Sequence, residues 1–312
     1  MRILVTGGAG FIGSNTVDAL VASGKHQVSV LDDLSAGKRE QVNPSATFYQ
    51  ADVRDNARVT EIIEREKPEV MYHLAAQMDV RRSVAEPAFD AQVNLVGFLN
   101  LMEAGRRSGL KRVIFSSTGG AIYGEQERFP CDEEHPCRPV SPYGVAKFAT
   151  ERYLFFYQVQ YGIPYVAMRY ANVYGPRQDP HGEAGVVAIF CGRLLEKKPA
   201  TIFGEGRQTR DYVFVGDVVR ANLAALDSNY IGAVNVGTGI ETSVNQLYTE
   251  LAAVAGASDK PTYAAARPGE QQRSVISPAR ALRELGWRPQ VALRDGLSQT
   301  LQFFKQAANR GA

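Results

Sequence analysis

The sequence predicts an α/β fold: a doubly wound, Rossmann-like parallel sheet with helices on both faces, followed by a smaller C-terminal substrate-binding lobe. Three observations support this prediction. Strand and helix patterns alternate along the chain, a glycine-rich turn follows the first strand, and an acidic residue ends the second strand. With 312 residues and 45% hydrophobic content, the chain can bury a large core and still form a second lobe.

Apolar runs bounded by turn residues predict the strands, and the patterns between them predict the connecting helices. The strands are expected at 2–6, 27–31, 47–50, 69–73, 112–117 and 164–169, and the helices at about 11–23, 55–66, 89–107 and 143–161. Asp55 is expected to cap the helix that follows it. The smaller lobe is expected to begin after Pro176, with helices near 184–197, 243–255 and 293–308.

The first strand runs directly into a turn in which glycines recur at every third position. Gly7, Gly10 and Gly13 form this G-x-x-G-x-x-G pattern, and a helix follows at once. Because glycine has no side chain, the backbone N–H groups of such a turn can approach a pyrophosphate, with the positive end of the helix behind them. Phe11 and Ile12 belong to the same turn and are expected to lie beside the cofactor.

An acid at the end of the second strand indicates which cofactor the turn would hold. Asp32 follows Gly13 by nineteen residues. There it can hold both adenosine-ribose hydroxyls of NAD and would repel the 2′-phosphate of NADP; a simple loop cap is the alternative role. The cofactor is therefore predicted to be NAD. The other expected cofactor contacts follow the third and fourth strands: Asp52 toward the adenine amino group, Val53 against its ring, and Leu74, Ala75 and Ala76.

Two residues one helical turn apart predict the chemistry. Tyr143 and Lys147 share one face of a helix, because side chains four positions apart are neighbours there. A free tyrosine titrates near pH ~10, so a tyrosine that acts as a base near neutral pH needs its pKa lowered by roughly three units. A nearby cation favours the phenolate and supplies such a shift. The pair therefore predicts acid–base catalysis on a hydroxyl group.

Composition argues against several other classes of protein. The net charge of +2, with scattered Lys and Arg, does not suggest a nucleic-acid partner, and no apolar run approaches the ~20 residues that span a membrane. Three cysteines make a disulfide framework unexpected. Cys131, His135 and Cys137 lack C-x-x-C spacing and a fourth ligand, which favours a loop with incidental thiols over a metal site. We expect a cytoplasmic protein, and His73 reads as a structural histidine within an apolar strand.

Taken together, these motifs resemble the extended short-chain dehydrogenase/reductase superfamily, and within it the NAD-dependent nucleotide-sugar epimerases, above all the UDP-glucose 4-epimerases. The resemblance covers nearly the whole chain. Its markers are the glycine turn from Gly7 to Gly13, His73-Leu74-Ala75-Ala76, the run from Ser116 to Gly124, Tyr143 with Lys147, and Arg169-Tyr170-Ala171-Asn172-Val173-Tyr174-Gly175-Pro176.

The resemblance implies an enzyme that interconverts UDP-galactose and UDP-glucose through a 4-keto intermediate, with tightly bound NAD as reversible hydride acceptor. Tyr143, as phenolate, would take the proton from the sugar C4 hydroxyl. Thr118 would relay or orient that proton, with Ser117 as the alternative hydroxyl because spacing after this strand varies within the family. Lys147 would also hold the nicotinamide ribose.

Substrate contacts are implied by the resemblance in the second half of the chain. Asn172 matches a position that meets substrate phosphate, and Arg210 and Arg267 would hold the UDP diphosphate. Guanidinium groups suit a diphosphate because each offers forked donors. Without the family, either arginine would read as an ordinary surface charge.

Other reactions on the same scaffold remain as alternatives. Related 4,6-dehydratases carry an Asp-Glu pair after the threonine, whereas this chain has Gly119 and Gly120, so elimination lacks an acid and a base. A UDP-N-acetylhexosamine or UDP-uronate 4-epimerase stays open. A non-catalytic NAD-sensing regulator is disfavoured because Tyr143 and Lys147 are both present.

The resemblance also bears on domains and assembly. It implies that residues 1–175 form the NAD-binding domain, completed by about 210–240, and that 176–312 form the substrate-binding lobe interleaved with it. It further implies a homodimer in which the helices at 89–107 and 143–161 pack into a four-helix bundle. Ordinary core burial explains part of the same apolar pattern.

Overall fold

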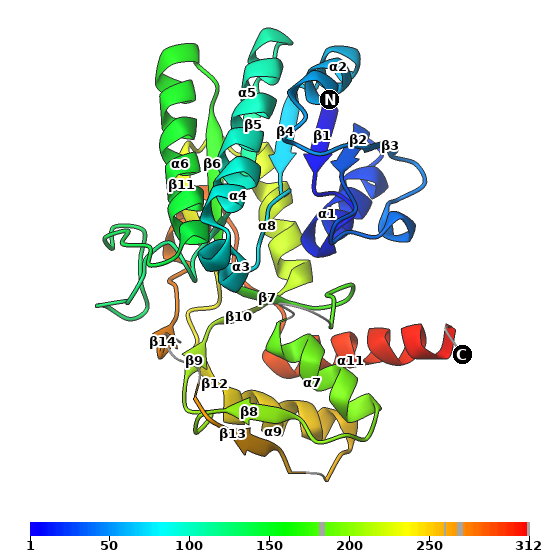
Figure 1. The fold of residues 1–312 in the computed structure, drawn as a ribbon, viewed down its shortest axis with the longest axis vertical. Helices are drawn as coiled ribbons and strands as arrows, with labels where there is room; N and C mark the ends of the chain where they lie inside the picture. The colour runs from blue at the N-terminus through cyan, green and yellow to red at the C-terminus, as the bar shows by residue number, and fades with distance from the viewer. Residues whose placement is uncertain (181–184, 259, 267–270, 311–312) are drawn as a thin grey trace.

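A seven-stranded parallel sheet forms the centre of the molecule (Figure 1). The structure is a computed structural model that describes residues 1–180, 185–258, 260–266 and 271–310. The strands stand in the order β11-β6-β5-β4-β1-β2-β3. They are β1 Arg2–Thr6, β2 Gln27–Asp32, β3 Thr47–Gln50, β4 Val70–His73, β5 Arg112–Thr118, β6 Tyr165–Tyr170 and β11 Gly232–Val236.

The six strands predicted from sequence are confirmed to within one residue at either end. The seventh, β11, pairs in parallel with β6, with Val234 opposite Met168. The run Gly232–Val236 was not predicted as a strand, because its glycine and asparagine weaken the signal of Val234 and Val236. Strand order reverses between β1 and β4, and in open α/β sheets ligands bind outside the carboxyl ends of the strands at such a point.

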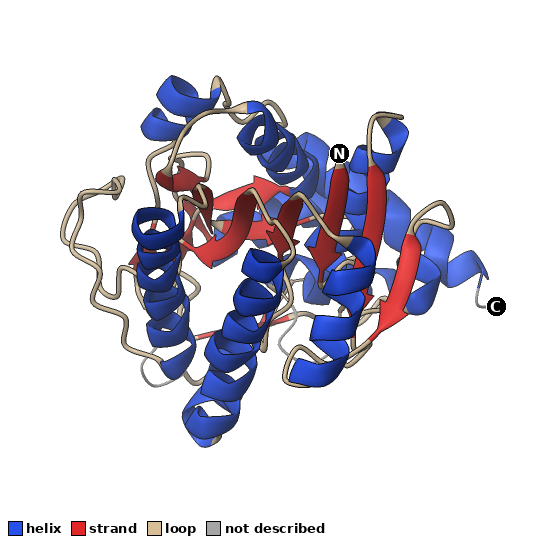
Figure 2. Ribbon diagram, turned by 90° about the horizontal axis from the view of Figure 1, so that it is seen from above, coloured by secondary structure: helices blue, strands red, loops and turns tan. Residues whose placement is uncertain are grey.

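Helices cover both faces of this sheet (Figure 2). On one face, α1 (Phe11–Ala22) packs against α8 (Val215–Asp227); on the other lie α2 (Asn56–Glu66), α5 (Gly97–Arg107) and α6 (Pro142–Tyr161). Side chains of β1 alternate between the two layers, so Ile3 and Val5 enter the first core and Leu4 the second. Parallel strands buried on both faces explain their continuous apolar runs.

The helix predicted at 89–107 is corrected to three pieces. A short helix α4 (Pro87–Ala91) is followed by the π-helical turn η2 (Gln92–Val96) and then by α5. A further short helix, α3 (Val80–Ala85), was not predicted. Such π-turns often occur at functional sites, and here Asn94 within the turn donates through Nδ2 to the carbonyl oxygen of Gln77 at 2.9 Å.

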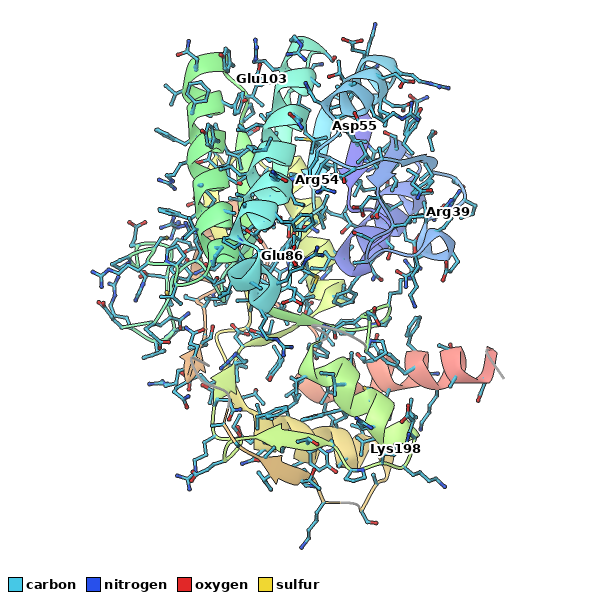
Figure 3. The ribbon with its side chains drawn as sticks, in the orientation of Figure 1. Arg39, Arg54, Asp55, Glu86, Glu103 and Lys198 are labelled. Carbon is cyan, nitrogen blue, oxygen red and sulfur yellow. The ribbon has the colours of Figure 1, made fainter. Side chains whose placement is uncertain are left out.

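Side-chain caps fix where two helices begin. The Asp55 carboxylate accepts from the backbone N–H of Arg58 at 3.0 Å, which confirms its predicted capping role, and it lies at the start of α2 (Figure 3). Ser141 caps α6 in the same way by accepting from Gly144 N, and Pro142 fills the first helical position, where its missing N–H costs nothing. The catalytic candidates on α6 therefore start from a defined turn.

The smaller lobe lies beyond the carboxyl edge of the sheet (Figure 1). Its helices α7 (Val186–Leu195), α9 (Val244–Ala255) and α11 (Leu293–Arg310) share one core with the short strands β7 Asn172–Tyr174, β8 Thr201–Phe203 and β10 Tyr212–Phe214. The other short strands in this part of the chain are β9 Thr209–Arg210, β12 Thr242–Ser243, β13 Thr262–Ala264 and β14 Arg273–Ser274. Helix α10 (Ala279–Leu285) instead packs on α8 and β11. We propose a division near residue 175, with α8 and β11 completing the large domain.

None of the helices in the described ranges is long and apolar enough to cross a membrane.

Candidate active site

The glycine turn after β1 has the backbone geometry of a phosphate cradle. Gly7 adopts φ +72°, a conformation that L-residues other than glycine rarely take. A Cβ added at Gly7 would lie 2.5 Å from the backbone N of Ala75, and one added at Gly13 would collide with the carbonyl oxygen of Gly7. The glycine turn, helix α1 and the loop after β4 therefore pack closely, with backbone directly against backbone. This cradle fits the pyrophosphate of a dinucleotide at the start of α1.

Asp32 ties two loops together at the end of β2. Its carboxylate accepts from the backbone N–H of Ala9 and of Leu34, both at 2.9 Å, and the residue is 6% exposed. Burial raises the pKa of Asp32, and the two hydrogen bonds oppose that rise. The loop-cap role considered from the sequence is therefore present. A carboxylate offers about four acceptor positions, so two remain for ribose hydroxyls.

The loop after β4 is pinned beside this turn. His73 lies in the core, 1% exposed, with Nδ1 2.8 Å from Thr6 Oγ1. Burial lowers the pKa of His73 to about 3, so the ring is neutral, and it stacks on Phe115. Thr6 Oγ1 also accepts from Ala75 N at 3.3 Å, which holds Leu74, Ala75 and Ala76 against the glycine turn. The structural reading of His73 agrees with these contacts.

Asp52 and Val53, which follow β3, both contact neighbouring residues of the chain. Asp52 accepts from Arg54 Nε at 2.9 Å, and this hydrogen bond is the main cause that lowers the pKa of Asp52. Val53 is buried against α5, where its side chain fills the space that a Cβ on Gly97 would need. Both residues lie at the carboxyl edge of the sheet, on the side expected for adenine.

Tyr143 and Lys147 lie on one face of the first turns of α6. Lys147 is 2% exposed; its Nζ donates to the carbonyl oxygen of Ser116 at 2.8 Å and stands 5.7 Å from the centroid of the Tyr143 ring. Burial lowers the pKa of Lys147 to about 8, while Asp90 acts in the opposite direction. The lysine therefore stays mostly protonated at neutral pH.

The expectation that Lys147 alone lowers the pKa of Tyr143 is not met. Burial raises that pKa, and the charge of Asp90 raises it further. The reason is that the phenol of Tyr143 is buried away from water, which disfavours its anion. Lys147 therefore does not by itself offset the burial of the phenol.

Ser117 and Thr118 point to opposite sides of β5, because side chains alternate along a strand. Ser117 is buried and its Oγ donates to Glu151 Oε1 at 2.6 Å. Glu151 belongs to α6, so Ser117 faces that helix. Thr118 Oγ1 accepts from Ala121 N at 3.1 Å, and the Ala121 carbonyl oxygen lies against Gly144, which follows Tyr143 in the sequence. Ser117 is thus engaged by a buried carboxylate, whereas among the described residues the Thr118 hydroxyl bonds only within its own turn, and we keep Thr118 as the proposed hydroxyl of the site.

Of the three predicted substrate residues, Asn172 and Arg210 lie in the described part of the chain. Asn172 begins β7 and is exposed; a Cβ added at Gly120 would lie 4.0 Å from its Oδ1 and 3.9 Å from Thr118 Oγ1, so both side chains border one space. Arg210 lies in β9, between β12 and β14, and its Nη1 donates to the carbonyl oxygen of Thr209 at 2.8 Å. Arg267 lies outside the described residues.

A buried ion pair behind the site was not predicted from the sequence. Glu151, one turn after Lys147 on α6, accepts from Arg169 Nη2 at 2.6 Å and Nε at 3.0 Å. Their side chains are 1% and 4% exposed. Arg169 also donates to the Tyr123 hydroxyl at 2.9 Å. The available signal was a single arginine inside the apolar strand Tyr165–Tyr170.

The loop that carries Cys131, His135 and Cys137 is held by contacts within the chain. His135 uses both ring nitrogens within the loop: Nδ1 lies 2.9 Å from the Pro136 carbonyl oxygen, and Nε2 accepts from Glu127 N. Cys131 and Cys137 are free thiols, and burial raises the pKa of each. The part of the chain that the structure describes brings together no group of three or more His, Cys, Asp or Glu side chains able to hold a metal ion.

A dinucleotide cradle at the switch point of a parallel sheet, with Tyr143 and Lys147 on one face of α6 and Lys147 bonded to the end of β5, defines a nicotinamide-dependent enzyme that acts on a hydroxyl group. The model of the NAD-dependent epimerase/dehydratase family matches residues 3–237, and the chain belongs to that family. NAD is its cofactor.

Close relatives of this chain agree with that placement. A UDP-glucose 4-epimerase of Mycolicibacterium smegmatis is 48% identical over 311 residues, which cover 98% of this chain and 99% of the relative. The crystal structure of a UDP-glucose 4-epimerase with UDP-glucose from Thermotoga maritima has a TM-score of 0.97 at 48% identity, covering 99% of this chain and all of that one. A Thermus thermophilus UDP-glucose 4-epimerase in complex with NAD has a TM-score of 0.93 at 46% identity, covering 98% of this chain and 100% of that one.

Proposed function

We propose that this chain is a UDP-glucose 4-epimerase that interconverts UDP-galactose and UDP-glucose through a 4-keto sugar. The observation that supports the proposal is the hydrogen bond from Lys147 Nζ to the Ser116 carbonyl oxygen, which ties the Tyr143–Lys147 face of α6 to the strand that ends in Thr118. The close similarity to UDP-glucose 4-epimerases over nearly the full chain supports it.

When bound, NAD supplies a reversible hydride acceptor, and the protein supplies its position and electrostatics. Gly7, Gly10, Phe11, Ile12 and Gly13 hold the pyrophosphate at the start of α1, and Asp32 receives the adenosine ribose. Asp52, Val53, Leu74, Ala75 and Ala76 complete the proposed cofactor set.

Proton transfer at the sugar is the task of three side chains. Tyr143 takes the proton of the C4 hydroxyl and later returns it, so the reaction has no net proton demand. Thr118 orients that hydroxyl from the neighbouring strand. Lys147, fixed by the carbonyl oxygen of Ser116, holds the nicotinamide ribose and places positive charge beside the phenol.

The space after Thr118 supports epimerisation over dehydration. A Cβ at Gly119 would lie 2.6 Å from Ile276 Cδ1 and 3.2 Å from the Tyr170 carbonyl oxygen, so the position has no room for an acidic side chain. Gly120 has room but carries no acid. Elimination of water across C5 and C6 needs both an acid and a base there.

The diphosphate of the substrate must be held firmly while the sugar turns. Asn172, which borders the same space as Thr118, meets the phosphate in this proposal, and Arg210 and Arg267 supply forked donors. Which sugar is preferred depends on a few pocket side chains, each worth only ~1–3 kcal/mol of selectivity. A UDP-N-acetylhexosamine or UDP-uronate is the alternative substrate.

The proposal is tested by incubating the purified protein with UDP-galactose, with and without added NAD, and following UDP-glucose by nucleotide-sugar chromatography. Conversion is expected in both samples, because the cofactor is regenerated at each turnover and stays bound. Absence of conversion by folded, NAD-loaded protein would contradict the assignment. The same assay with N-acetylated and uronate substrates would then identify the alternative.

Thr118→Val is expected to lower kcat for UDP-galactose by about 10²-fold, because it removes the hydroxyl and keeps the shape of the side chain. Ser117→Ala, which removes the neighbouring hydroxyl from its bond with Glu151, serves as the control. It is expected to cost stability and to leave kcat within a few-fold. A larger loss of kcat in Ser117→Ala than in Thr118→Val would reverse the assignment of the two hydroxyls.

We also propose a homodimer in the cytoplasm. Phe155, Phe156 and Val159 on α6 are 54%, 45% and 65% exposed, an apolar face suited to pairing with a second copy through α5 and α6. The free thiols of Cys131, Cys137 and Cys191 suit a reducing compartment.

A further inference from the structure

A buried carboxylate stands beside the catalytic helix and has no part in the reaction described above. Asp90, in α4, is 1% exposed. Its Oδ1 accepts from Gln77 Nε2 at 3.0 Å and from Asn94 Nδ2 at 2.9 Å. Its Oδ2 is buried and has no hydrogen-bond partner among the described residues. A buried carboxylate oxygen that no donor satisfies is costly, and such groups are often kept for a functional reason.

The fold places Asp90 at the level of the catalytic pair. Helices α4–α5 and α6 each return the chain between parallel strands, so they run in the same direction, and α4 and η2 pack against α6 (Figure 1). Thr150 on α6 lies with Oγ1 3.3 Å from the Asn94 carbonyl oxygen. Asp90 lies about one helical turn before Asn94, and on α6 Lys147 lies about one turn before Thr150. The carboxylate therefore lies against the stretch of α6 that carries Tyr143 and Lys147.

Other charged groups near α6 are engaged elsewhere. Four of them form ion pairs on the neighbouring elements: Arg82 with Glu86, Arg169 with Glu151, Glu103 with Arg106, and Arg54 with Asp52. Glu103 also accepts from Tyr157, and Arg112 donates to the carbonyl oxygens of Ala225 and Tyr230. Arg81 is likewise engaged in an interaction. His73 is neutral, because burial lowers its pKa to about 3. Asp90 is the charge that acts on both catalytic residues, raising the pKa of Tyr143 and opposing the fall in the pKa of Lys147.

We propose that Asp90 is a positioning residue whose fixed negative charge keeps Lys147 protonated and sets the pH range in which the Tyr143–Lys147 pair transfers protons. The inference rests on the function proposed above. Burial alone would favour the neutral amine of Lys147, which can neither favour the phenolate nor act as a cation toward the cofactor. A carboxylate with one oxygen held by Gln77 and Asn94 supplies the opposing charge and connects it to the loop after β4.

Asp90→Asn tests this proposal with almost no change of shape. The amide oxygen can still accept from Gln77 and Asn94, so the charge is the main property removed. Removing a negative charge lowers the pKa of both Tyr143 and Lys147. The acidic and basic limbs of the kcat profile for UDP-galactose are therefore expected to move together to lower pH, by about 0.5–1 unit.

Glu86→Gln is the matched control. Glu86 directly precedes α4, is exposed (Figure 3), and pairs with Arg82 of α3. Its removal changes net charge by the same amount and is expected to leave both limbs in place. If Asp90→Asn lowers kcat but leaves both limbs where the native enzyme has them, Asp90 only packs the helices and the proposal is wrong.

A second measurement separates this inference from the proposed function. Ultraviolet titration of NAD-loaded protein, with Tyr143→Phe backgrounds subtracted, reports the phenolate of Tyr143 without substrate. It is expected to form at lower pH in Asp90→Asn than in the native chain, even if UDP-galactose is not the substrate. An unchanged titration overturns the role of Asp90. Asp90→Ser gives a second neutral variant should Asp90→Asn fail to fold.

Discussion

Tyr143→Phe is expected to lower turnover of UDP-galactose by about 10²–10⁴-fold while NAD stays bound. The variant removes one hydroxyl and keeps the ring that lies 5.7 Å from Lys147 Nζ. In the proposed function, the sugar C4 proton then loses its acceptor. In the same proposal the cofactor is held by the glycine turn, Asp32 and Lys147, which are unchanged. The measurement is kcat by nucleotide-sugar chromatography, with bound NAD quantified after denaturation.

Tyr153→Phe provides the matched control for that experiment. Tyr153 lies further along α6 and is 40% exposed, so the loss of its hydroxyl is expected to leave kcat unchanged. A Tyr143→Phe enzyme that retains near-native kcat would remove Tyr143 as the base. A variant that loses NAD together with activity would instead assign the hydroxyl to cofactor binding.

The fold could be predicted from sequence where local pattern and tertiary role coincide. Buried parallel strands read as apolar runs, and Gly7, Asp55 and Ser141 mark where elements begin because each satisfies a local backbone requirement. The interruption at Gln92–Val96 could not be predicted. Its residues suit a regular helix, and the π-turn is accompanied by the hydrogen bonds of Asn94 to Gln77, far away in the sequence.

The site residues, too, could be predicted from the sequence only where a local pattern reveals them. Tyr143 and Lys147 can be found from sequence because their spacing alone puts them on one face of a helix. Asp90 and Glu151 cannot, because a carboxylate in a helix is normally solvated and only the packing of α4 and β6 against α6 shows that these two are buried. Spacing also does not predict the pKa of Tyr143, because burial raises it although Lys147 lies one turn away.

Glu151→Gln is expected to destabilise the protein by ~3–5 kcal/mol, because it leaves the guanidinium of Arg169 buried without its counter-charge. The amide oxygen can still accept from Ser117, so the lost charge accounts for most of the effect. Chemical unfolding in urea measures the free energy. Because Glu151 lies one turn after Lys147, loosening this pair is also expected to lower kcat while leaving the pH limbs unmoved, unlike Asp90→Asn.

Two comparisons isolate the buried charge as the cause. Glu103→Gln on α5 removes a carboxylate from a more exposed pair with Arg106 (Figure 3), and such pairs contribute only ~0–1 kcal/mol. The double variant Glu151→Leu with Arg169→Met removes both charges and is expected to recover much of the loss, because no ion is left unpaired. If Glu151→Gln costs no more than Glu103→Gln, the pair does not fix α6 against β5 and β6. The alignment of Lys147 with Ser116 would then depend on the cap at Ser141 and on apolar packing.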